Sequence, residues 1–374
     1  MRVVYVFLVA LLVSTTFALR PKWHELEGYT FERFEKDFGK KYGSEIERAK
    51  RKAIFEESLH EAKMHNSKTS SYKKGINKFS DWTKNEFQRL NGAKPRQMHH
   101  IAEELRQRDY VKVHKSSGVP LPKSVDWRNR APSVLSAVKD QGQCGSCWAH
   151  GSTENIETYY AIATGQMYAL SQQEITACAP NPDDCGGTGG CGGSIAELAF
   201  DYVKHHGMAQ EWSNPYTAYF GTTGNCTNTT ASPVVWLDGY VKAPANDQES
   251  VMDILAHTGP LSVNVDASEW GAFDSGIYDG CHYAKNISID HVVQLVGYGH
   301  EPSLGMDYWI IRNSWSPDWG ENGYIKLKRT STPACGWDVD PQDGTACRGS
   351  PNELHVCGEC GILWDTSYPI VKMN

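Results

Sequence analysis

Two cysteines stand three positions apart in the segment CGSCW, residues 144–148, and Gln141 precedes them. A Cys-x-x-Cys pair can form a redox couple, supply half of a metal site, or combine a structural thiol with a reactive one. A zinc site would need two more ligands at a spacing that is absent here. A thioredoxin-like pair belongs to a βαβ pattern, which is also absent. The rest of the chain has to supply the partners of a reactive thiol.

A nucleophilic cysteine attacks as the thiolate, so its pKa has to fall from about 8.5. Cys147 opens a segment with helical character, residues 147–164, which ends at Gly165. The helix dipole favours an anion at that position. His291 begins one apolar strand and could form an imidazolium, and Asn313 ends another and could orient it. Taken singly, a strand His and an Asn-Ser turn are more often structural.

The first residues, the cysteine count and the glycosylation sequons indicate a secreted globular protein. The first 18 residues combine one Arg with an apolar run, which predicts a signal peptide cleaved after Ala18. The 11 cysteines of a secreted chain favour disulfides, and their odd number leaves one thiol over. Asn225, Asn228 and Asn286 stand in glycosylation sequons.

Charge divides the chain into two parts of opposite sign. Residues 19–120 carry 23 basic and 15 acidic side chains, a net charge of +8. Residues 121–374 carry 13 basic and 29 acidic side chains, a net charge of -16. We expect the basic segment to dock on the acidic one. A nucleic-acid-binding arm is the alternative, but in a secreted chain no nucleic-acid partner is expected.

The coarse pattern predicts helices first and strands later. Residues 44–66 have helical periodicity, and Ser44 with Glu47 forms a capping box. Strands are predicted over residues 261–267, 291–299 and 307–315. This order indicates an α+β fold with two packed halves.

These blocks together resemble the papain-like cysteine proteases of the cathepsin L-like branch. That family has the signature C-G-[SA]-C-[WY] with a His and an Asn downstream. Here His291 follows Cys147 by 144 residues and Asn313 follows it by 166. Upstream, the family's ERFNIN-type propeptide helix is matched by Glu47, Arg51, Phe55 and Asn66, and its second motif by GINKFSD at residues 75–81.

The resemblance covers nearly the whole chain and implies its organisation. Residues 1–18 would be the signal peptide, 19–120 a mainly helical inhibitory propeptide, and 121–374 the papain-like peptidase domain. The peptidase domain would be a two-domain fold with a helical left domain and a β-barrel-like right domain.

The resemblance also implies the mechanism. Cys147 and His291 would rest as a thiolate–imidazolium pair, Asn313 would hold the imidazole, and Gln141 would donate to the oxyanion. The reaction would be peptide-bond hydrolysis through a covalent acyl-enzyme, without metal or cofactor. An endopeptidase is expected, because no His-rich occluding insertion follows the Gly-rich loop of residues 184–194 and no insertion stands just before Gln141.

The implied partners and location follow. Peptide and protein substrates, the chain's own propeptide and cystatin-type inhibitors are the expected partners of a monomeric zymogen. Its location would be the secretory pathway, ending in a lysosome or lysosome-like vacuole or outside the cell.

Substrate selection is expected in the pocket for the second residue before the cleaved bond. The family's substrate-binding positions map to Gly192, Gly193, Ser194, Ile195, Ala196, Asn264, Ile289, Asp290, Val292, Trp315 and Asp365. An acidic floor at Asp365 would pair with a basic side chain, which leads to the hypothesis that Arg is accepted as well as Leu or Phe. The alternative is that Asp365 faces solvent.

The family's disulfides map to Cys144–Cys191, Cys178–Cys226 and Cys281–Cys360. The remaining four cysteines allow three full pairings, which the sequence leaves open: Cys185, Cys335, Cys347 and Cys357. The segment 333–360 is longer than the family norm and is expected to be a surface loop or to border the specificity pocket.

Two rival functions are considered. One is a non-catalytic, secreted papain-like binding protein, which is disfavoured because such relatives usually lose the nucleophile. The other is a metal-binding module built on Cys357, Cys360 and His355, which would need reduced thiols in an oxidising compartment.

Overall fold

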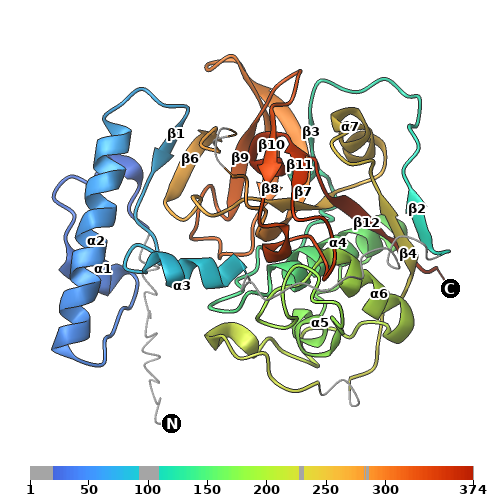
Figure 1. The fold of residues 1–374 in the computed structure, drawn as a ribbon, viewed down its shortest axis with the longest axis horizontal. Coiled ribbons are helices and arrows are strands. Elements are labelled where there is room, and N and C mark those ends of the chain that lie inside the picture. The colour runs from blue at the N-terminus through green and yellow to red at the C-terminus, as the bar shows by residue number, and fades with distance from the viewer. Residues whose placement is uncertain (1–19, 92–108, 227–230, 282, 284–285, 374) are drawn as a thin grey trace, which may run out of the picture.

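A computed structural model describes residues 20–91, 109–226, 231–281, 283 and 286–373. The predicted signal peptide and Asn228 lie outside the described residues. The N-terminal helices stand beside a larger body that combines helices with one extended sheet (Figure 1). The α+β architecture is therefore confirmed. No helix in the described part of the chain is long and apolar enough to cross a bilayer.

The helices divide between the expected propeptide, residues 19–120, which we call the prosegment, and the expected peptidase domain, residues 121–374. The prosegment contains α1 (Phe31–Asp37), α2 (Glu45–Asn66) and α3 (Lys84–Gln88). The peptidase domain contains α4 (Cys147–Thr164), α5 (Gln172–Cys178), α6 (Ala196–His206) and α7 (Gln248–His257). Short 3-10 turns lie at Trp23–Glu25, Arg89–Asn91, Trp127–Asn129, Ala218–Phe220, Pro341–Asp343 and Glu359–Gly361.

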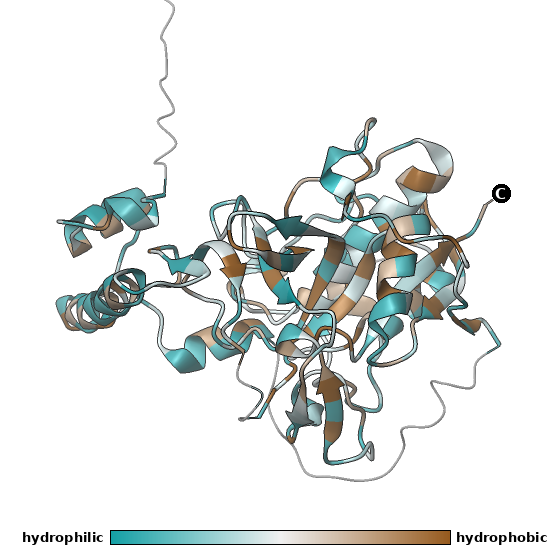
Figure 2. Ribbon diagram, turned by 90° about the horizontal axis from the view of Figure 1, so that it is seen from above, coloured by the Kyte–Doolittle hydropathy of each residue, from teal (hydrophilic) through white to brown (hydrophobic). Residues whose placement is uncertain are grey.

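Helix α2 begins and packs as its sequence predicts. The Ser44 hydroxyl accepts a hydrogen bond from the Glu47 N–H at 3.2 Å, which satisfies a donor left open at the helix start. Phe55 is fully buried among aromatic rings of α1. Arg51 binds both carboxylate oxygens of Glu86 at 2.7 Å, tying α2 to α3. Hydrophilic and hydrophobic residues alternate along the ribbon of these helices (Figure 2).

One ten-stranded sheet runs through the molecule in the order β1-β6-β9-β8-β7-β5-β12-β4-β2. Its strands are β1 (Tyr72–Lys74), β2 (Val111–Val113), β4 (Leu237–Lys242), β5 (Leu261–Val265), β6 (Phe273–Tyr278), β7 (His291–Glu301), β8 (Met306–Arg312), β9 (Tyr324–Arg329) and β12 (Thr366–Val371), with β3 (Val125–Asp126) paired to β7. The sheet is open, so the expected barrel-like form describes it only loosely. Both end strands of this path, β1 and β2, come from the expected propeptide, which covers the sheet edges.

A separate hairpin lies at the centre of Figure 1, formed by β10 (Cys335–Asp338) and β11 (Leu354–Cys357). Its apolar residues Leu354 and Val356 pack on Ile287 and Ile289, just ahead of β7. The structure contains five disulfides, which are Cys144–Cys191, Cys178–Cys226, Cys185–Cys347, Cys281–Cys360 and Cys335–Cys357. These pairs settle the partners of the four cysteines that the sequence left open.

Charged and polar groups of the prosegment dock on acidic residues of the peptidase domain. Arg20 binds Asp274 at 2.8 Å, and both side chains are buried. Lys78 binds Asp140 at 2.6 Å. Each of these ion pairs joins a prosegment cation to a carboxylate of the peptidase domain. They are contacts of the kind that the opposite net charges of the two segments predict.

We predict that Arg20→Ala accelerates acid processing of the zymogen by at least about tenfold, because Asp274 would be left buried without its cation. Conversion of purified zymogen at about pH 5, followed on gels, measures this rate. Lys50→Ala is the matched control, since Lys50 is exposed and makes no ion pair among the described residues. Equal rates for Arg20→Ala and the unaltered chain would contradict the role of this contact.

Candidate active site

Cys147 is the first residue of α4 and the only cysteine outside a disulfide among the described residues. Its side chain is buried in the zymogen. Helix α4 is 18 residues long and ends at Gly165, which has a φ of 74°. This is the predicted helix with its predicted C-cap, and it places the free thiol at the positive end of the helix dipole.

His291 begins β7, and Asn313 directly follows β8. The Nε2–H of His291 donates to Oδ1 of Asn313 at 2.8 Å. The indole of Trp315 covers the imidazole with ring centroids 4.8 Å apart. The Nδ1 atom of His291 is buried and makes no hydrogen bond with any described residue. One ring nitrogen is thus fixed by Asn313, and the other remains open for a reacting group.

Helix α4 closely approaches strand β7, which places Cys147 next to Val292, the neighbour of His291. Gly151 lies one helical turn after Cys147, and a Cβ added there would stand 3.2 Å from Cγ1 of Val292. Val292 is the neighbour of His291. Because residues four apart share a helix face, the tight contact at Gly151 sets Cys147 against the start of β7.

The side-chain amide of Gln141, the expected oxyanion donor, is hydrogen-bonded to the prosegment. Its Nε2 donates to the carbonyl oxygen of Leu90 at 2.7 Å and to that of Cys144 at 2.9 Å. Its Oε1 accepts from the Ser314 hydroxyl at 2.7 Å, which fixes the amide. Next to Leu90, the Asn91 amide donates to Asp290 at 2.7 Å. The prosegment therefore satisfies the groups that a substrate would need.

Burial shifts the pKa values of Cys147 and His291 in the directions that disfavour a thiolate–imidazolium ion pair. Desolvation raises the pKa of Cys147 to about 12, although the backbone N–H of Val292 opposes the shift. Desolvation also lowers the pKa of His291 to about 4, despite its bond to Asn313. Burial beneath the prosegment therefore opposes both charges of the thiolate–imidazolium pair that the resemblance implies.

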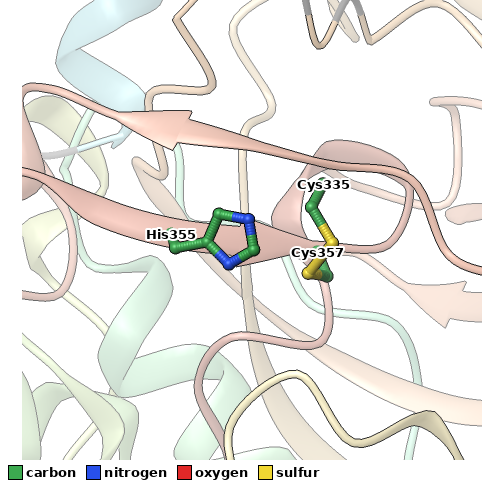
Figure 3. A group of neighbouring side chains, drawn as sticks. All are labelled: Cys335, His355 and Cys357. Carbon is green, nitrogen blue, oxygen red and sulfur yellow. A yellow bond between two sulfur atoms is a disulfide. The ribbon is translucent and has the colours of Figure 1, made fainter.

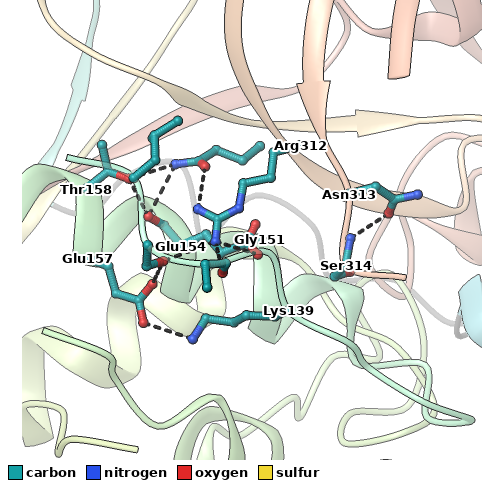
Figure 4. Close-up of polar contacts among 12 residues, drawn as sticks. Lys139, Gly151, Glu154, Glu157, Thr158, Arg312, Asn313 and Ser314 are labelled. Carbon is teal, nitrogen blue, oxygen red and sulfur yellow. Dashed lines mark hydrogen bonds and ion pairs between the residues drawn. The ribbon is translucent and has the colours of Figure 1, made fainter. Parts of the chain in front are cut away.

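A buried polar network behind the site ties α4 to β8. Arg312 is fully buried, lies 3.4 Å from Glu154 of α4, and donates to Gln294 at 3.3 Å (Figure 4). Lys139 binds Glu157 at 3.0 Å in the same group. Since Asn313 follows Arg312 in the chain, this network holds the strand that presents the amide to His291.

The expected substrate-binding positions come from five segments. Gly192, Gly193, Ser194 and Ile195 lie in the Gly-rich loop, Ala196 begins α6, Asn264 lies in β5, Ile289 and Asp290 precede β7, Val292 lies in β7, Trp315 follows β8, and Asp365 precedes β12. Asn264 is paired with Val292 across β5 and β7, and its amide donates to Asp365 at 3.2 Å. Trp315 lies apart from this group, against the prosegment rings of Phe79 and Phe87.

Asp365 is not a free acidic floor. Its carboxylate binds Lys242 at 2.6 Å, and the same ammonium binds Glu197 at 2.8 Å. Burial and the neighbouring Asp365 charge raise the pKa of Glu197. Because Lys242 already compensates Asp365, the hypothesis of a pocket that attracts Arg loses its basis. The alternative of a solvent-facing Asp365 is also wrong, since the side chain is buried.

The rival metal module is contradicted by the disulfides. Cys335, His355 and Cys357 do lie close together, but the two sulfur atoms are bonded to each other (Figure 3). Cys360 is bonded to Cys281. Disulfide sulfurs carry no thiolate to bind a metal.

Several functional residues were missed by the sequence analysis. Leu90 and Asn91 follow the second propeptide motif but carry no signature of their own. Nothing in the sequence around Lys242 indicates that it pairs with Asp365. The loop between β10 and β11 could have been found from its sequence, because it contains Cys347, which pairs with Cys185 in a distant segment.

The fold and these side chains define a class. Residues 121–343 match the papain family of cysteine proteases, and residues 31–87 match the cathepsin propeptide inhibitor domain. The chain therefore belongs to the papain family and is a cathepsin L-like cysteine peptidase with an inhibitory prosegment.

Individual relatives agree with this assignment. Cathepsin L of Sarcophaga peregrina is 35% identical over 356 residues, covering 90% of this chain and 97% of that protein. Cysteine protease 1 of Oryza sativa subsp. japonica is 35% identical over 343 residues, 89% of this chain, which spans only 61% of that longer protein. Digestive procathepsin L 3 of the Tenebrio molitor larval midgut superposes with a TM-score of 0.71 at 31% identity, covering 91% of this chain and 97% of that one.

We predict that Gln141→Ala lowers kcat/KM of the processed enzyme by about 100-fold or more, because an oxyanion donor is lost. Steady-state hydrolysis of a fluorogenic peptide measures the change. Gln143→Ala is the matched control, since Gln143 is exposed two residues away. Comparable activity of Gln141→Ala and the control would remove Gln141 from the reaction.

We predict that Lys242→Met changes the second-residue preference toward Arg. The change leaves Asp365 without its cation, so a basic substrate side chain gains a partner that is absent from the unaltered enzyme. The ratio of kcat/KM for matched peptides with Arg or Leu at that position should rise by about tenfold or more. The double variant Lys242→Met/Asp365→Asn controls for packing and should not gain Arg preference. An unchanged ratio in Lys242→Met would show that Asp365 does not reach the substrate.

Proposed function

We propose that the processed chain hydrolyses peptide bonds with Cys147 as nucleophile, His291 as general acid and base, Asn313 as the group that orients the imidazole, and Gln141 as oxyanion donor. The observation that carries this proposal is the 2.8 Å bond from His291 to Asn313 at a site that holds the only free thiol of the described residues. This combination is the general arrangement for an activated cysteine nucleophile.

The reaction would proceed in two steps. The sulfur of Cys147 attacks the peptide carbonyl, while Gln141 and the backbone N–H of Cys147 stabilise the oxyanion. His291 protonates the leaving amine, so the C–N bond breaks and a thioester remains. Water, deprotonated by His291, then hydrolyses the thioester and restores the thiol.

The zymogen would be latent for two physical reasons. The Leu90 carbonyl takes the hydrogen bond of Gln141 that the oxyanion requires. Burial also opposes the charged forms of the thiol and the imidazole. Removal of the prosegment readmits water, which lowers the desolvation cost of both charges and allows the ion pair to form.

A secretory route, ending in a lysosome-like compartment or outside the cell, is supported by the five disulfides. Asn225 and Asn286 are exposed, as glycan acceptors must be. We propose peptide substrates and the prosegment as partners, with cystatin-type inhibitors and a monomeric state as further expectations.

Alkylation by iodoacetamide tests the proposal. Between about pH 6 and 8 the zymogen should react at least about tenfold more slowly than the processed enzyme, because only the thiolate reacts and burial suppresses it. Peptidase activity should disappear as Cys147 is alkylated, and Cys147→Ser should be inactive after processing in trans. A folded, processed enzyme with a reactive Cys147 but no peptidase activity would favour the binding-protein alternative.

A further inference from the structure

The segment between β10 and β11, residues 339–353, crosses from one half of the peptidase domain to the other, and we call it the strap. It begins on the sheet side, where the Asp338 carboxylate accepts from the Ile289 N–H at 3.3 Å. Asn286 adds two bonds there, accepting from the Val339 N–H at 2.8 Å and donating to Asp340 at 3.0 Å. These contacts fix the strap to the residues that lead into His291.

The far end of the strap is fixed to the helical half. Cys347 forms a disulfide with Cys185 of the Gly-rich loop. The Arg348 N–H donates to the Asp183 carbonyl at 2.7 Å, and the Gly186 N–H donates to that of Ala346 at 3.0 Å. The disulfide packs against Ile195 and Leu198. The strap is therefore bonded on both sides of the line along which the two halves meet.

The crossing is tight at Gly344. A Cβ added to Gly344 would stand 1.7 Å from the carbonyl oxygen of Ile289. A Cβ added to Gly186 would stand 2.4 Å from the Gly344 carbonyl oxygen and 2.9 Å from Cγ2 of Ile195. The strap backbone thus runs against Ile289 and against Gly186, and Gly186 in turn contacts Ile195. It therefore borders both expected walls of the second-residue pocket, Ile195 and Ile289. Both walls are buried.

The strap contacts Ile289, which lies on the acyl side of the expected cleft. Ile289 stands two residues before His291, on the side of the expected second-residue pocket, which receives the part of the substrate N-terminal to the cleaved bond. Trp315, by contrast, packs against His291 and the prosegment ring of Phe79. The obstruction therefore affects the acyl portion of a substrate.

We propose that the strap closes the substrate cleft beyond the second-residue pocket, so that the enzyme releases one or two residues from free N-termini. This inference rests on the peptidase function proposed above and narrows the endopeptidase expected from the sequence. The bonds broken and formed are those of the peptidase reaction proposed above. The peptide C–N bond breaks, a thioester to Cys147 forms with an aminoacyl or dipeptidyl group, the leaving amine takes a proton from His291, and water releases the acyl group.

The charge of the strap fits a free N-terminus. The strap carries Asp340, Asp343 and Glu353 against one basic residue, Arg348, which is paired with Asp184. Burial raises the pKa of Asp290, the residue before His291, and the charges of Asp266 and Asp343 add to the rise, so Asp343 lies within electrostatic reach of the site. An α-ammonium group is attracted to such carboxylates, whereas an acetylated N-terminus is not.

The strap would persist in the processed enzyme. Both cysteines of the Cys185–Cys347 disulfide lie within the peptidase domain, so removal of the prosegment leaves the crossing intact. A mild thiol that keeps Cys147 reduced must leave this disulfide formed, and mass spectrometry of unreduced digests verifies that it does.

The experiment compares two decapeptides that differ only in a free or acetylated N-terminus, digested by the processed enzyme. The free peptide should lose one or two residues at a time, and the acetylated peptide should react at least about tenfold more slowly. Internal cleavage of both peptides at similar rates would overturn the proposal. A failure of the peptidase function itself looks different, because neither peptide would then be cut.

Releasing the crossing gives a second test. The double variant Cys185→Ser/Cys347→Ser should gain internal cleavage and lose the preference for a free N-terminus. Cys335→Ser/Cys357→Ser is the matched control, because it removes one disulfide of the hairpin but leaves the crossing bonded. Iodoacetamide labelling of Cys147 reports whether each variant is folded. An unaltered product pattern in the variant with the released strap would contradict the proposal. If the variants do not fold, the comparison of the free and acetylated decapeptides with the unaltered enzyme remains the test.

Discussion

The site depends on the close approach of helix α4 to strand β7. Gly151 has no side chain at the point where Val292 contacts the helix, so the backbone of α4 packs closely against β7. Cys147 lies one turn before Gly151, and His291 is the neighbour of Val292. A longer side chain at Gly151 would separate the thiol from the imidazole even though neither catalytic group had changed. The buried Arg312–Glu154 pair supports the same contact from β8, where Asn313 follows Arg312.

Latency and catalysis use the same groups. The hydrogen bond that Gln141 offers to a reacting carbonyl is given to Leu90 in the zymogen. The burial that the prosegment imposes opposes charge on Cys147 and His291 alike. A desolvated ion pair is costly unless its two charges compensate fully. Access of water, as much as access of substrate, therefore separates the latent from the active form.

Local features of the sequence predicted local structure well. The Ser44 cap and the helix from Cys147 to Gly165 follow from side-chain chemistry within a few residues, and the structure has both. The contacts that decide specificity join distant segments. Asp365 was expected to present a free charge, but its partner Lys242 lies in another strand, and no periodicity in the sequence predicts that pair. The loop between β10 and β11 was expected as a longer segment, whereas its course beside Ile195 and Ile289 depends on three-dimensional packing.

The most direct test is to trap the acyl-enzyme. Processed enzyme would be mixed with an unblocked peptide ester, quenched in acid within the first turnovers, and digested for mass spectrometry. The account predicts an acyl adduct on Cys147 alone, with the mass of one or two residues. No adduct on Cys147 in an enzyme that turns over the ester would contradict the covalent mechanism, and an adduct of many residues would show that the strap leaves the cleft open.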